Sequence, residues 1–276
     1  MRRFLKFIFW STVFILSIRG CLTIVSNIPQ KSNKIAILEI NGVILNSESI
    51  LKRLWSFEKT PSIKAVLVRI DSPGGTVGAS QEIYSEIKRI RGVTGKKFIA
   101  SLSNIGTSGA YYIASACDKI IVNKGSITGS IGVISTFITA EKLLEFLKIT
   151  PFIIKSGKFK DSGSVLRKPT TDDLNYFQHI VMELYNQFKK DVSERNPKIS
   201  KVIDEIADGR VLTGEEAIKL GLADSEGTFK DAITIAALEA GIKGEPEIIW
   251  PKKKAKILEY IEHLSSNIIS PLFFLF

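Results

Sequence analysis

From Asn33 onward the sequence alternates short apolar runs with segments of helical periodicity, and this alternation limits the possible folds more than any other feature. The strand-like runs are Ile35–Ile40, Ala65–Asp71, Phe98–Ser103, Lys119–Asn123 and Thr150–Ile154. The helix-like segments are Asn46–Phe57, Gly78–Arg91, Thr139–Leu147 and Asp172–Val192, with one more short helix predicted from Ser108 to Cys117. Strands followed repeatedly by helices predict an α/β fold with a mainly parallel sheet.

The longest predicted helix, Asp172–Val192, has one apolar face that we expect to be buried. The members of this stripe recur at helical spacing and are Leu174, Phe177, Val181, Leu184 and Phe188. A residue off the stripe, His179, is expected to face solvent.

The chain of 276 residues, 45% of them hydrophobic, is long enough for one large domain with a substantial core. We assign this domain to residues 31–250, between an N-terminal segment 1–30 and a tail 251–276. Residues 4–28 are largely apolar and long enough to cross a membrane, although Lys6 and Arg19 interrupt them. A cleaved signal peptide and lipidation at Cys21 are alternatives, but the residues before Cys21 match neither cleavage site well. We expect an uncleaved transmembrane helix that places the domain on the outer side.

The net charge of +10 does not indicate nucleic-acid binding, because eight of the basic residues lie in two short terminal stretches and the body between them is nearly balanced in charge. They are Arg2, Arg3, Lys6, Arg19, Lys252, Lys253, Lys254 and Lys256. Basic residues beside apolar segments favour a membrane surface instead. The apolar end, residues 268–276, is too short to span a bilayer. It could be disordered, pack on a neighbouring subunit, insert into the membrane surface or occupy the peptide groove.

The stretch Thr107–Ala114 carries the strongest indication of chemistry. A turn is predicted at Asn104–Gly106, after the strand Phe98–Ser103, so Ser108 would lie in the first turn of a helix at the end of a strand. Unpaired N–H groups at a helix start suit a developing oxyanion. A serine that only caps the helix is the alternative.

A glycine loop, Asp71–Thr76, also follows a strand and leads into a helix. Gly74 and Gly75 would let the backbone approach a ligand closely, although a tight turn explains them equally well. Neither this loop nor Gly125–Gly132 has the glycine spacing of a nucleotide-binding motif. We expect neither a cofactor nor a metal, and Cys21 and Cys117 give no disulfide framework.

A serine nucleophile needs a group that accepts its proton. The two histidines, His179 in the long helix and His263 in the tail, do not lie beside a strand end. A lysine can serve as the base where burial lowers its pKa toward neutrality. The segment Lys155–Asp161 contains three candidate lysines.

Several motifs occur together in this chain and decide between these possibilities. They are Ser72–Gly75, Ser108–Ala114, Thr128–Val133, Ser156–Asp161, Gly209–Ala217 and Gly221–Asp224. In this order they closely resemble the signal peptide peptidase A family, bacterial membrane-anchored Ser-Lys peptidases, in its short single-repeat form. The resemblance covers roughly residues 33–251. Two departures are Ala110, where the family usually has glycine, and Val165-Leu166, where it often has Pro-Phe.

The resemblance implies the fold shared by crotonases and the Clp protease subunit. It also implies that Ser108 is the nucleophile and Lys160 the general base, with Ser130 holding the lysine amine. The oxyanion hole would be the N–H groups of Gly75 and Gly109. A lysine base further implies activity that rises from acid toward neutral or alkaline pH.

As the resemblance implies, the substrates would be cleaved signal peptides and similar apolar peptides at the outer face of the bacterial cell membrane. It also implies a homo-oligomeric ring in which the lysine of one subunit can reach the serine of its neighbour. Other functions remain open: trimming of stomatin-type membrane proteins, acyl-CoA chemistry on the same fold, and an inactive membrane scaffold. The acyl-CoA alternative would need acid/base carboxylates near the glycine loops, where Asp71 alone is close.

Overall fold

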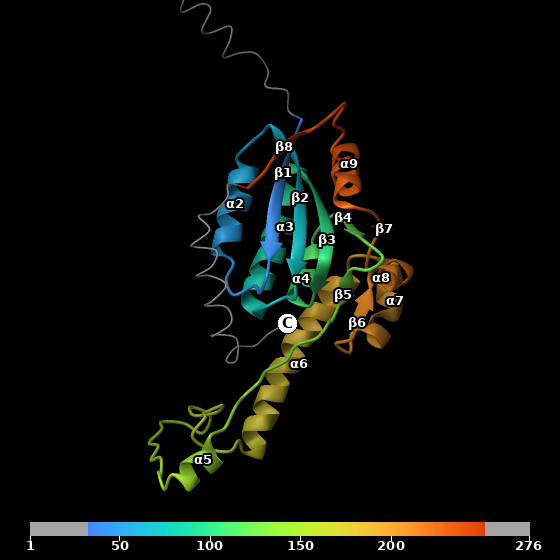
Figure 1. Cartoon of the computed structure of the whole chain (residues 1–276). Coiled ribbons are helices and arrows are strands. Elements are labelled where there is room, and N and C mark those ends of the chain that lie inside the picture. The colour runs from blue at the N-terminus through green and yellow to red at the C-terminus, as the bar shows by residue number, and fades with distance from the viewer. Residues whose placement is uncertain (1–32, 252–276) are drawn as a thin grey trace, which may run out of the picture.

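The computed structural model describes residues 33–251, which form one sheet with helices on both of its faces (Figure 1). The strands are β1 Lys34–Asn41, β2 Ile63–Ser72, β3 Lys97–Thr107, β4 Lys119–Val122, β5 Ile127–Gly129, β6 Val211–Thr213, β7 Ser225–Glu226 and β8 Glu247–Ile249. The helices are α2 Glu48–Glu58, α3 Val77–Thr94, α4 Gly109–Ser115, α5 Glu141–Phe146, α6 Thr171–Ser193, α7 Pro197–Ile206, α8 Gly214–Leu220 and α9 Phe229–Glu239.

The sheet is largely parallel, which confirms the α/β prediction. Its strand order is β6-β5-β3-β2-β1-β8, and β4 pairs with both β3 and β7. Only the β5–β6 pair is antiparallel among the described strands. Strand β3 is long enough to pair with two strands in succession. Its middle, Ile99–Ser101, pairs with β4, and its end, Ile105–Thr107, pairs with β5.

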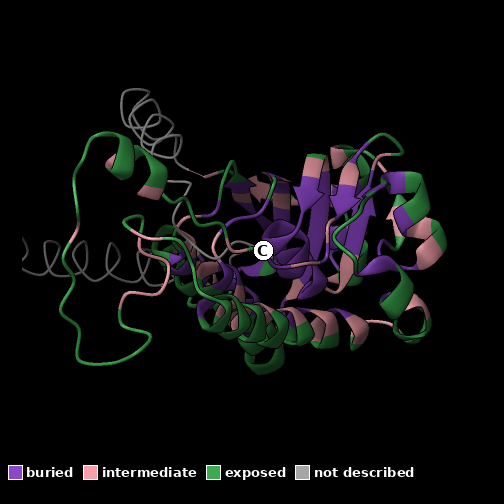
Figure 2. Cartoon of the chain, turned by 90° about the horizontal axis from the view of Figure 1, so that it is seen from below, coloured by how far each residue is buried: buried purple, intermediate pink, exposed green. Residues whose placement is uncertain are grey.

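The core lies on both sides of the central strands. In β1, Ala36 and Leu38 face a cluster that includes residues of α2, α3 and α4, whereas Ile35 and Ile37 face α9. Continuous apolar strands of this kind are typical of parallel sheets covered on both faces. Figure 2 shows the sheet as the most buried part of the chain.

One region extends away from this core. We call residues 134–182 the arm; it comprises α5, its flanking loops and the N-terminal half of α6 (Figure 1). Helix α6 begins with a capping box in which Thr170 and Asp173 satisfy each other's backbone N–H groups. The arm exposes many large apolar side chains, among them Ile138, Phe146, Phe152, Ile154 and Leu174.

Three local predictions were wrong, two of them because of the arm. Residues Thr150–Ile154 form no strand, and Phe152 and Ile154 are 90% and 88% exposed. In α6 the predicted buried stripe is buried only at the end that contacts the body, so Leu174 is exposed and Phe188 is fully buried. The predicted turn Asn104–Gly106 is instead part of β3, because it pairs with β5.

The predicted transmembrane segment 1–30 and nearly all of the tail 251–276 lie outside the described residues. Within residues 33–251, no helix combines the length and apolar character needed to cross a bilayer.

Candidate active site

Ser108 lies at the sharp turn where β3 passes into α4. It is the N-cap residue of α4, one position before the predicted first turn, and its backbone has φ +57° and ψ −125°. This left-handed conformation costs a non-glycine residue about 1–3 kcal/mol and is typical of functional sites. A strained strand-to-helix turn presents the nucleophile in α/β-hydrolases. The local geometry therefore suits a nucleophile better than an ordinary cap, and Ser108 accepts no capping hydrogen bond.

Ser130 is placed beside Ser108 by the register of the sheet. Thr107 of β3 and Gly129 of β5 are paired, so the two serines that follow them leave the sheet side by side. The N–H of Ser108 donates to the carbonyl of Gly129 at 2.8 Å, and the N–H of Ser130 donates to the carbonyl of Arg210 at 2.7 Å. Ser130 has a positive φ of +53°, as Ser108 does.

The glycine loop between β2 and α3 packs directly against Ser108. A Cβ atom added to Gly74 would lie 2.9 Å from Ser108 Cβ and 2.8 Å from the nitrogen of Gly109. A Cβ atom added to Gly109 would lie 3.4 Å from the nitrogen of Gly75. The two contacts of Gly74 are shorter than a real Cβ atom makes, so only glycine fits at this position.

The backbone N–H groups of Gly75 and Gly109 are available for a ligand. Among residues 33–251, neither group donates a hydrogen bond to another protein atom. The loop that carries them is held by its neighbours: the N–H of Thr76 donates to the carbonyl of Ile44 at 2.7 Å, and the Thr107 hydroxyl donates to the carbonyl of Pro73 at 3.1 Å. Two fixed, unpaired N–H groups next to a serine form a suitable oxyanion site.

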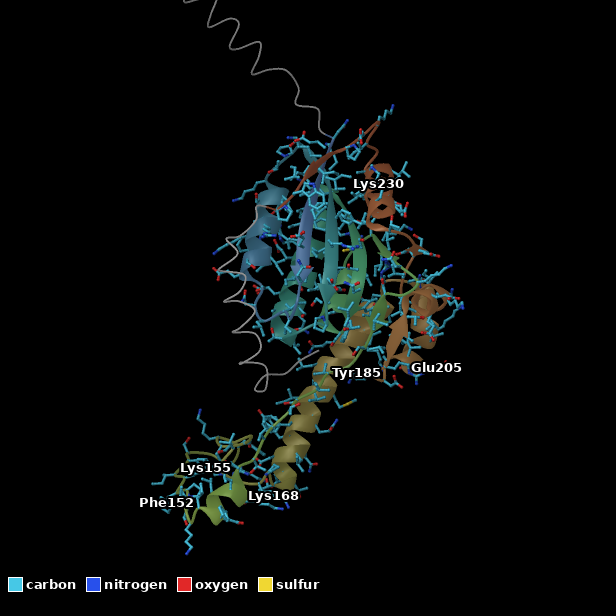
Figure 3. All side chains as sticks on the ribbon, viewed as in Figure 1. Phe152, Lys155, Lys168, Tyr185, Glu205 and Lys230 are labelled. Atoms are coloured by element: carbon cyan, nitrogen blue, oxygen red, sulfur yellow. The ribbon has the colours of Figure 1, made fainter. Side chains whose placement is uncertain are left out.

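The structure does not bring Lys160 to Ser108 within one chain. Lys160 is exposed in the arm, in a loop that packs on the start of α6, where the rings of Phe159 and Tyr176 stack at 5.0 Å. Figure 3 shows Lys155 and Phe152 of this loop at the far end of the arm. Four predicted site residues, Ser108, Ser130, Gly75 and Gly109, therefore converge, and the fifth lies apart.

The three lysines of this loop differ in their partners. Lys155 forms an ion pair with Asp161 at 2.6 Å, and Lys158 forms one with Asp172 at 2.5 Å. The ammonium group of Lys160 takes part in no ion pair with any residue that the structure describes. Of the three, Lys160 is thus the lysine without a carboxylate partner among the described residues, which is a distinction that the sequence did not provide.

The base of the loop is fixed by a cluster of charges around Arg167. Its guanidinium donates to Asp161 at 2.8 Å and to Asp173 at 2.6 Å. Asp173 also accepts hydrogen bonds from the Ser162 hydroxyl and from the N–H of Thr170. The hydrogen bonds from Arg167 are the main reason that the pKa values of both carboxyl groups lie well below their usual range.

The body end of α6 is attached to the serine-bearing helix. Tyr112 of α4 stacks on Tyr84 of α3 at 4.5 Å and packs against Phe188 of α6 at 4.8 Å. Its hydroxyl donates to Asp191, and its backbone N–H donates to the carbonyl of Ser108 at 2.9 Å. The helix that carries the arm therefore packs one turn away from Ser108.

Sequence reasoning missed two contributors to this site. The carbonyl of Arg210 fixes Ser130, and the only signal was that Arg210 lies in one of the family-like motifs. Ser80 of α3 lies against Gly109, and no motif in our reading included it. Among residues 33–251, no group of three or more His, Cys, Asp or Glu side chains is placed to hold a metal.

Comparison with known proteins identifies the family. The model of peptidase family S49 matches residues 91–243, a range that contains Ser108, Ser130 and Lys160. A protein described as a protease from Synechocystis sp. is 43% identical over 212 residues, which are 76% of this chain and 75% of the relative. A protein described as signal peptide peptidase SppA from Enterococcus faecium is 33% identical over 215 residues, 73% of this chain and 62% of the relative.

The similarity extends to other proteins. A protein described as a protease from Methanocaldococcus jannaschii is 35% identical over 196 residues, which are 71% of this chain and 62% of the relative. A solved structure of a membrane-bound stomatin-specific protease has a TM-score of 0.47 and 16% identity, covering 80% of this chain and 99% of that one. The family match and the Synechocystis relative together show that this chain belongs to peptidase family S49 and is a serine peptidase.

Proposed function

We propose that this protein is a membrane-anchored serine endopeptidase in which Ser108 and Lys160 form the catalytic dyad, and that it degrades cleaved signal peptides and similar apolar peptides. The observation that carries the proposal is the strained Ser108 beside the unpaired N–H groups of Gly75 and Gly109. The largely parallel sheet with helices on both faces fits the fold shared by crotonases and the Clp protease subunit.

The proposed chemistry is acyl transfer through a covalent intermediate. Ser108 Oγ attacks the peptide carbonyl carbon while the neutral amine of Lys160 accepts its proton. The carbonyl oxygen becomes an oxyanion that accepts hydrogen bonds from the N–H groups of Gly75 and Gly109. When the tetrahedral intermediate collapses, the C–N bond breaks and the lysine returns its proton to the leaving amine. Water then hydrolyses the acyl-serine by the same steps.

We propose that the lysine acts on a neighbouring subunit in a ring. Support comes from the position of Lys160, which lies in the arm between α5 and α6, while Ser108 lies in the body between β3 and α4. A lysine must be shielded from water to lose its proton near neutral pH. In a single chain Lys160 is exposed, and the exposed apolar side chains around it provide a surface that a second copy would cover. Ser130, beside Ser108, would then receive the incoming amine.

The membrane location rests on the sequence. Segment 1–30 would anchor the chain and place residues 31–250 on the extracytoplasmic side of a bacterial membrane. Apolar substrates such as released signal peptides would be most abundant there.

The direct test is labelling of Ser108 by a fluorophosphonate probe, combined with cleavage of an apolar peptide. Ser108→Ala should lose both labelling and cleavage. Lys160→Ala and Lys160→Arg should lose cleavage with their folds intact, because an arginine side chain cannot accept the serine proton. Substantial peptide turnover by purified Ser108→Ala or Lys160→Ala protein would contradict the dyad.

A further inference from the structure

The arm contains a cavity that the proposed catalytic steps do not use. It lies between the N-terminal half of α6, the segment 135–139 and the loop 163–169, and its volume is about 330 Å³. Its apolar lining consists of Phe137, Ile138, Leu174, Phe177 and Val181. In another protein, an apolar cavity of about 150 Å³ is already large enough to bind benzene. The arm cavity can therefore hold one large apolar side chain of a ligand.

The chemistry of this cavity suits an uncharged ligand. Among the described residues that line it, Arg167 alone carries a charge, and its guanidinium is paired with Asp161 and Asp173 at 2.8 and 2.6 Å. The lining is accessible, since Ile138 and Leu174 are 62% and 57% exposed. An apolar side chain placed in the cavity would remove this apolar surface from water, which is favourable.

A stretch of backbone connects the cavity to the nucleophile. Residues 131–139 follow Ser130, which lies beside Ser108, and they run alongside α6 from β5 toward α5 (Figure 1). From Gly132 to Ile138, no backbone N–H or C=O group is hydrogen-bonded to another residue that the structure describes. Unpaired backbone of this kind can pair with an extended peptide. A peptide bound at Ser108 and lying along this segment would reach the cavity.

We propose that the arm cavity binds an apolar side chain of the peptide substrate, about six residues from the scissile bond. Ser135 and Phe137 line the cavity and are five and seven residues after Ser130, in a segment that forms no helix. A peptide paired with an extended segment advances by the same distance per residue, so the two chains keep step. The cavity would thus favour long apolar peptides over short ones. This inference rests on the proposed function, which places the scissile bond at Ser108.

The protruding apolar side chains of the arm form a separate surface. Phe146, Phe152 and Ile154 are highly exposed, and none of the described residues between 140 and 162 lines the cavity. The proposed contact between subunits involves this protruding surface. The cavity instead continues the backbone segment that begins at Ser130, and for this reason we assign it to the substrate.

The test compares two fluorogenic peptides that share their sequence around the scissile bond. The short peptide ends about three residues from the bond on each side. The long peptide extends about eight residues on each side, and it carries a single added leucine, about six residues before the bond in one version and about six after it in the other. With the leucine on one of these sides, the long peptide should have a kcat/KM about tenfold higher than the short peptide, mainly through a lower KM.

Leu174→Asn is the variant that tests the cavity, and Leu143→Asn is its matched control. Both leucines are in helices of the arm and are 57% exposed, but Leu143 does not line the cavity. In Leu174→Asn, the ratio of the two kcat/KM values should fall to about one, because the cavity becomes polar. Leu143→Asn should keep the wild-type ratio. Ile138→Trp should also lower the ratio, since a larger ring fills the cavity without adding charge.

The same ratio in wild-type and Leu174→Asn protein would overturn the inference. A shift of Leu174→Asn toward smaller species in analytical ultracentrifugation would overturn it as well, because the cavity would then be an interface between copies of the chain. Neither result would affect the proposed function as long as cleavage of the short peptide depends on Ser108. Cleavage of the short peptide by Ser108→Ala would instead contradict the proposed function.

Discussion

The backbone at Ser108 is held in an unfavourable conformation by contacts on both sides. Its N–H is bonded to Gly129, its carbonyl accepts from Tyr112, and Gly74 lies against its Cβ atom. Each contact belongs to a different element, so the turn cannot relax without disturbing β5, α4 or the glycine loop. Strain that persists in this way is expected where it aims a reactive group.

The cost of this strain can be measured with two inactive variants. Ser108→Gly should be more stable than Ser108→Ala by about 1 kcal/mol, because glycine adopts positive φ without the Cβ clash. Denaturant unfolding of both proteins gives the difference. The control is Ser115 in α4, where the helical backbone should make the glycine variant less stable than the alanine variant. Equal stability of the two Ser108 variants would contradict the strain.

At the scale of single residues, the sequence predicted which residues belong to the site but not their geometry. Ser108, Gly75 and Gly109, which were assigned to one site from the sequence, lie close together in the structure. The positive φ of Ser108 depends on the pairing of β3 with the three-residue strand β5, which local periodicity cannot reveal. Lys160 was chosen only through the family resemblance, because three lysines in one loop have the same local pattern.

At the scale of elements, the arm is organised by charge rather than by a core. The side chains of Arg167, Asp161 and Asp173 link the loop after Lys160 to the first turn of α6. Asp173 is 2% exposed although its neighbours in the arm are mostly exposed. When one partner of a buried, hydrogen-bonded ion pair is neutralised, the charge of the other partner is left uncompensated.

This cluster should make the arm sensitive to acid. A carboxyl group whose pKa is lowered by folding stabilises the fold above its unfolded pKa of about 3.9, and the contribution is lost as the pH falls toward the lowered value. The pKa values of Asp161 and Asp173 are both lowered, so their contribution is complete at pH 7 and decreases below about pH 4. Hydrogen-exchange protection, measured relative to the intrinsic exchange rate at each pH, should therefore fall at pH 3 more in residues 155–175 than in the sheet.

Asp173→Asn should reproduce this loosening at pH 7. Asp172→Asn is the matched control, because Asp172 is exposed and its ion pair with Lys158 is solvated, so its loss should have little effect. If Asp173→Asn leaves exchange in the arm unchanged at pH 7, the cluster does not hold the arm.

The elements themselves were predictable where they are long enough to show a clear hydrophobic pattern. Strands β1 and β2 and helices α3 and α6 match the predicted segments closely. The short strands β5 to β8 have two or three residues each and depend on pairing with distant segments. Thr150–Ile154 misled the prediction because its apolar side chains are on the surface of the arm, and apolarity alone does not distinguish a buried strand from such a surface.

At the scale of the whole molecule, the body and the arm differ in how far their apolar side chains are buried. The body encloses buried apolar clusters on both faces of its sheet, whereas the arm is mostly exposed (Figure 2). Many of the exposed side chains of the arm are large and apolar. Soluble monomers rarely leave so many large apolar residues uncovered. Together with the separation of Lys160 from Ser108, this exposure motivates the proposed ring.

The shared dyad predicts that two inactive variants restore each other. When Ser108→Ala and Lys160→Ala chains are co-expressed in equal amounts, half of the serines and half of the lysines are intact. Random placement in a closed ring then gives about one quarter of the wild-type activity, because an intact serine must meet an intact lysine. Peptide cleavage by the mixed assembly is the measurement. A dyad formed within one chain would show no recovery, because each chain lacks one member.

The same mixture tests whether the arm makes the contact. Phe152→Ser and Ile154→Ser, introduced into both inactive chains, should abolish the recovery and shift the protein toward smaller species in analytical ultracentrifugation. These side chains are almost fully exposed, so the melting temperature of the body should not change. Val93→Ser is the matched control, because Val93 is an exposed apolar residue on α3, outside the arm, and its replacement should leave the recovery intact. Recovery that survives the arm substitutions would show that the lysine reaches its neighbour's serine through some other surface.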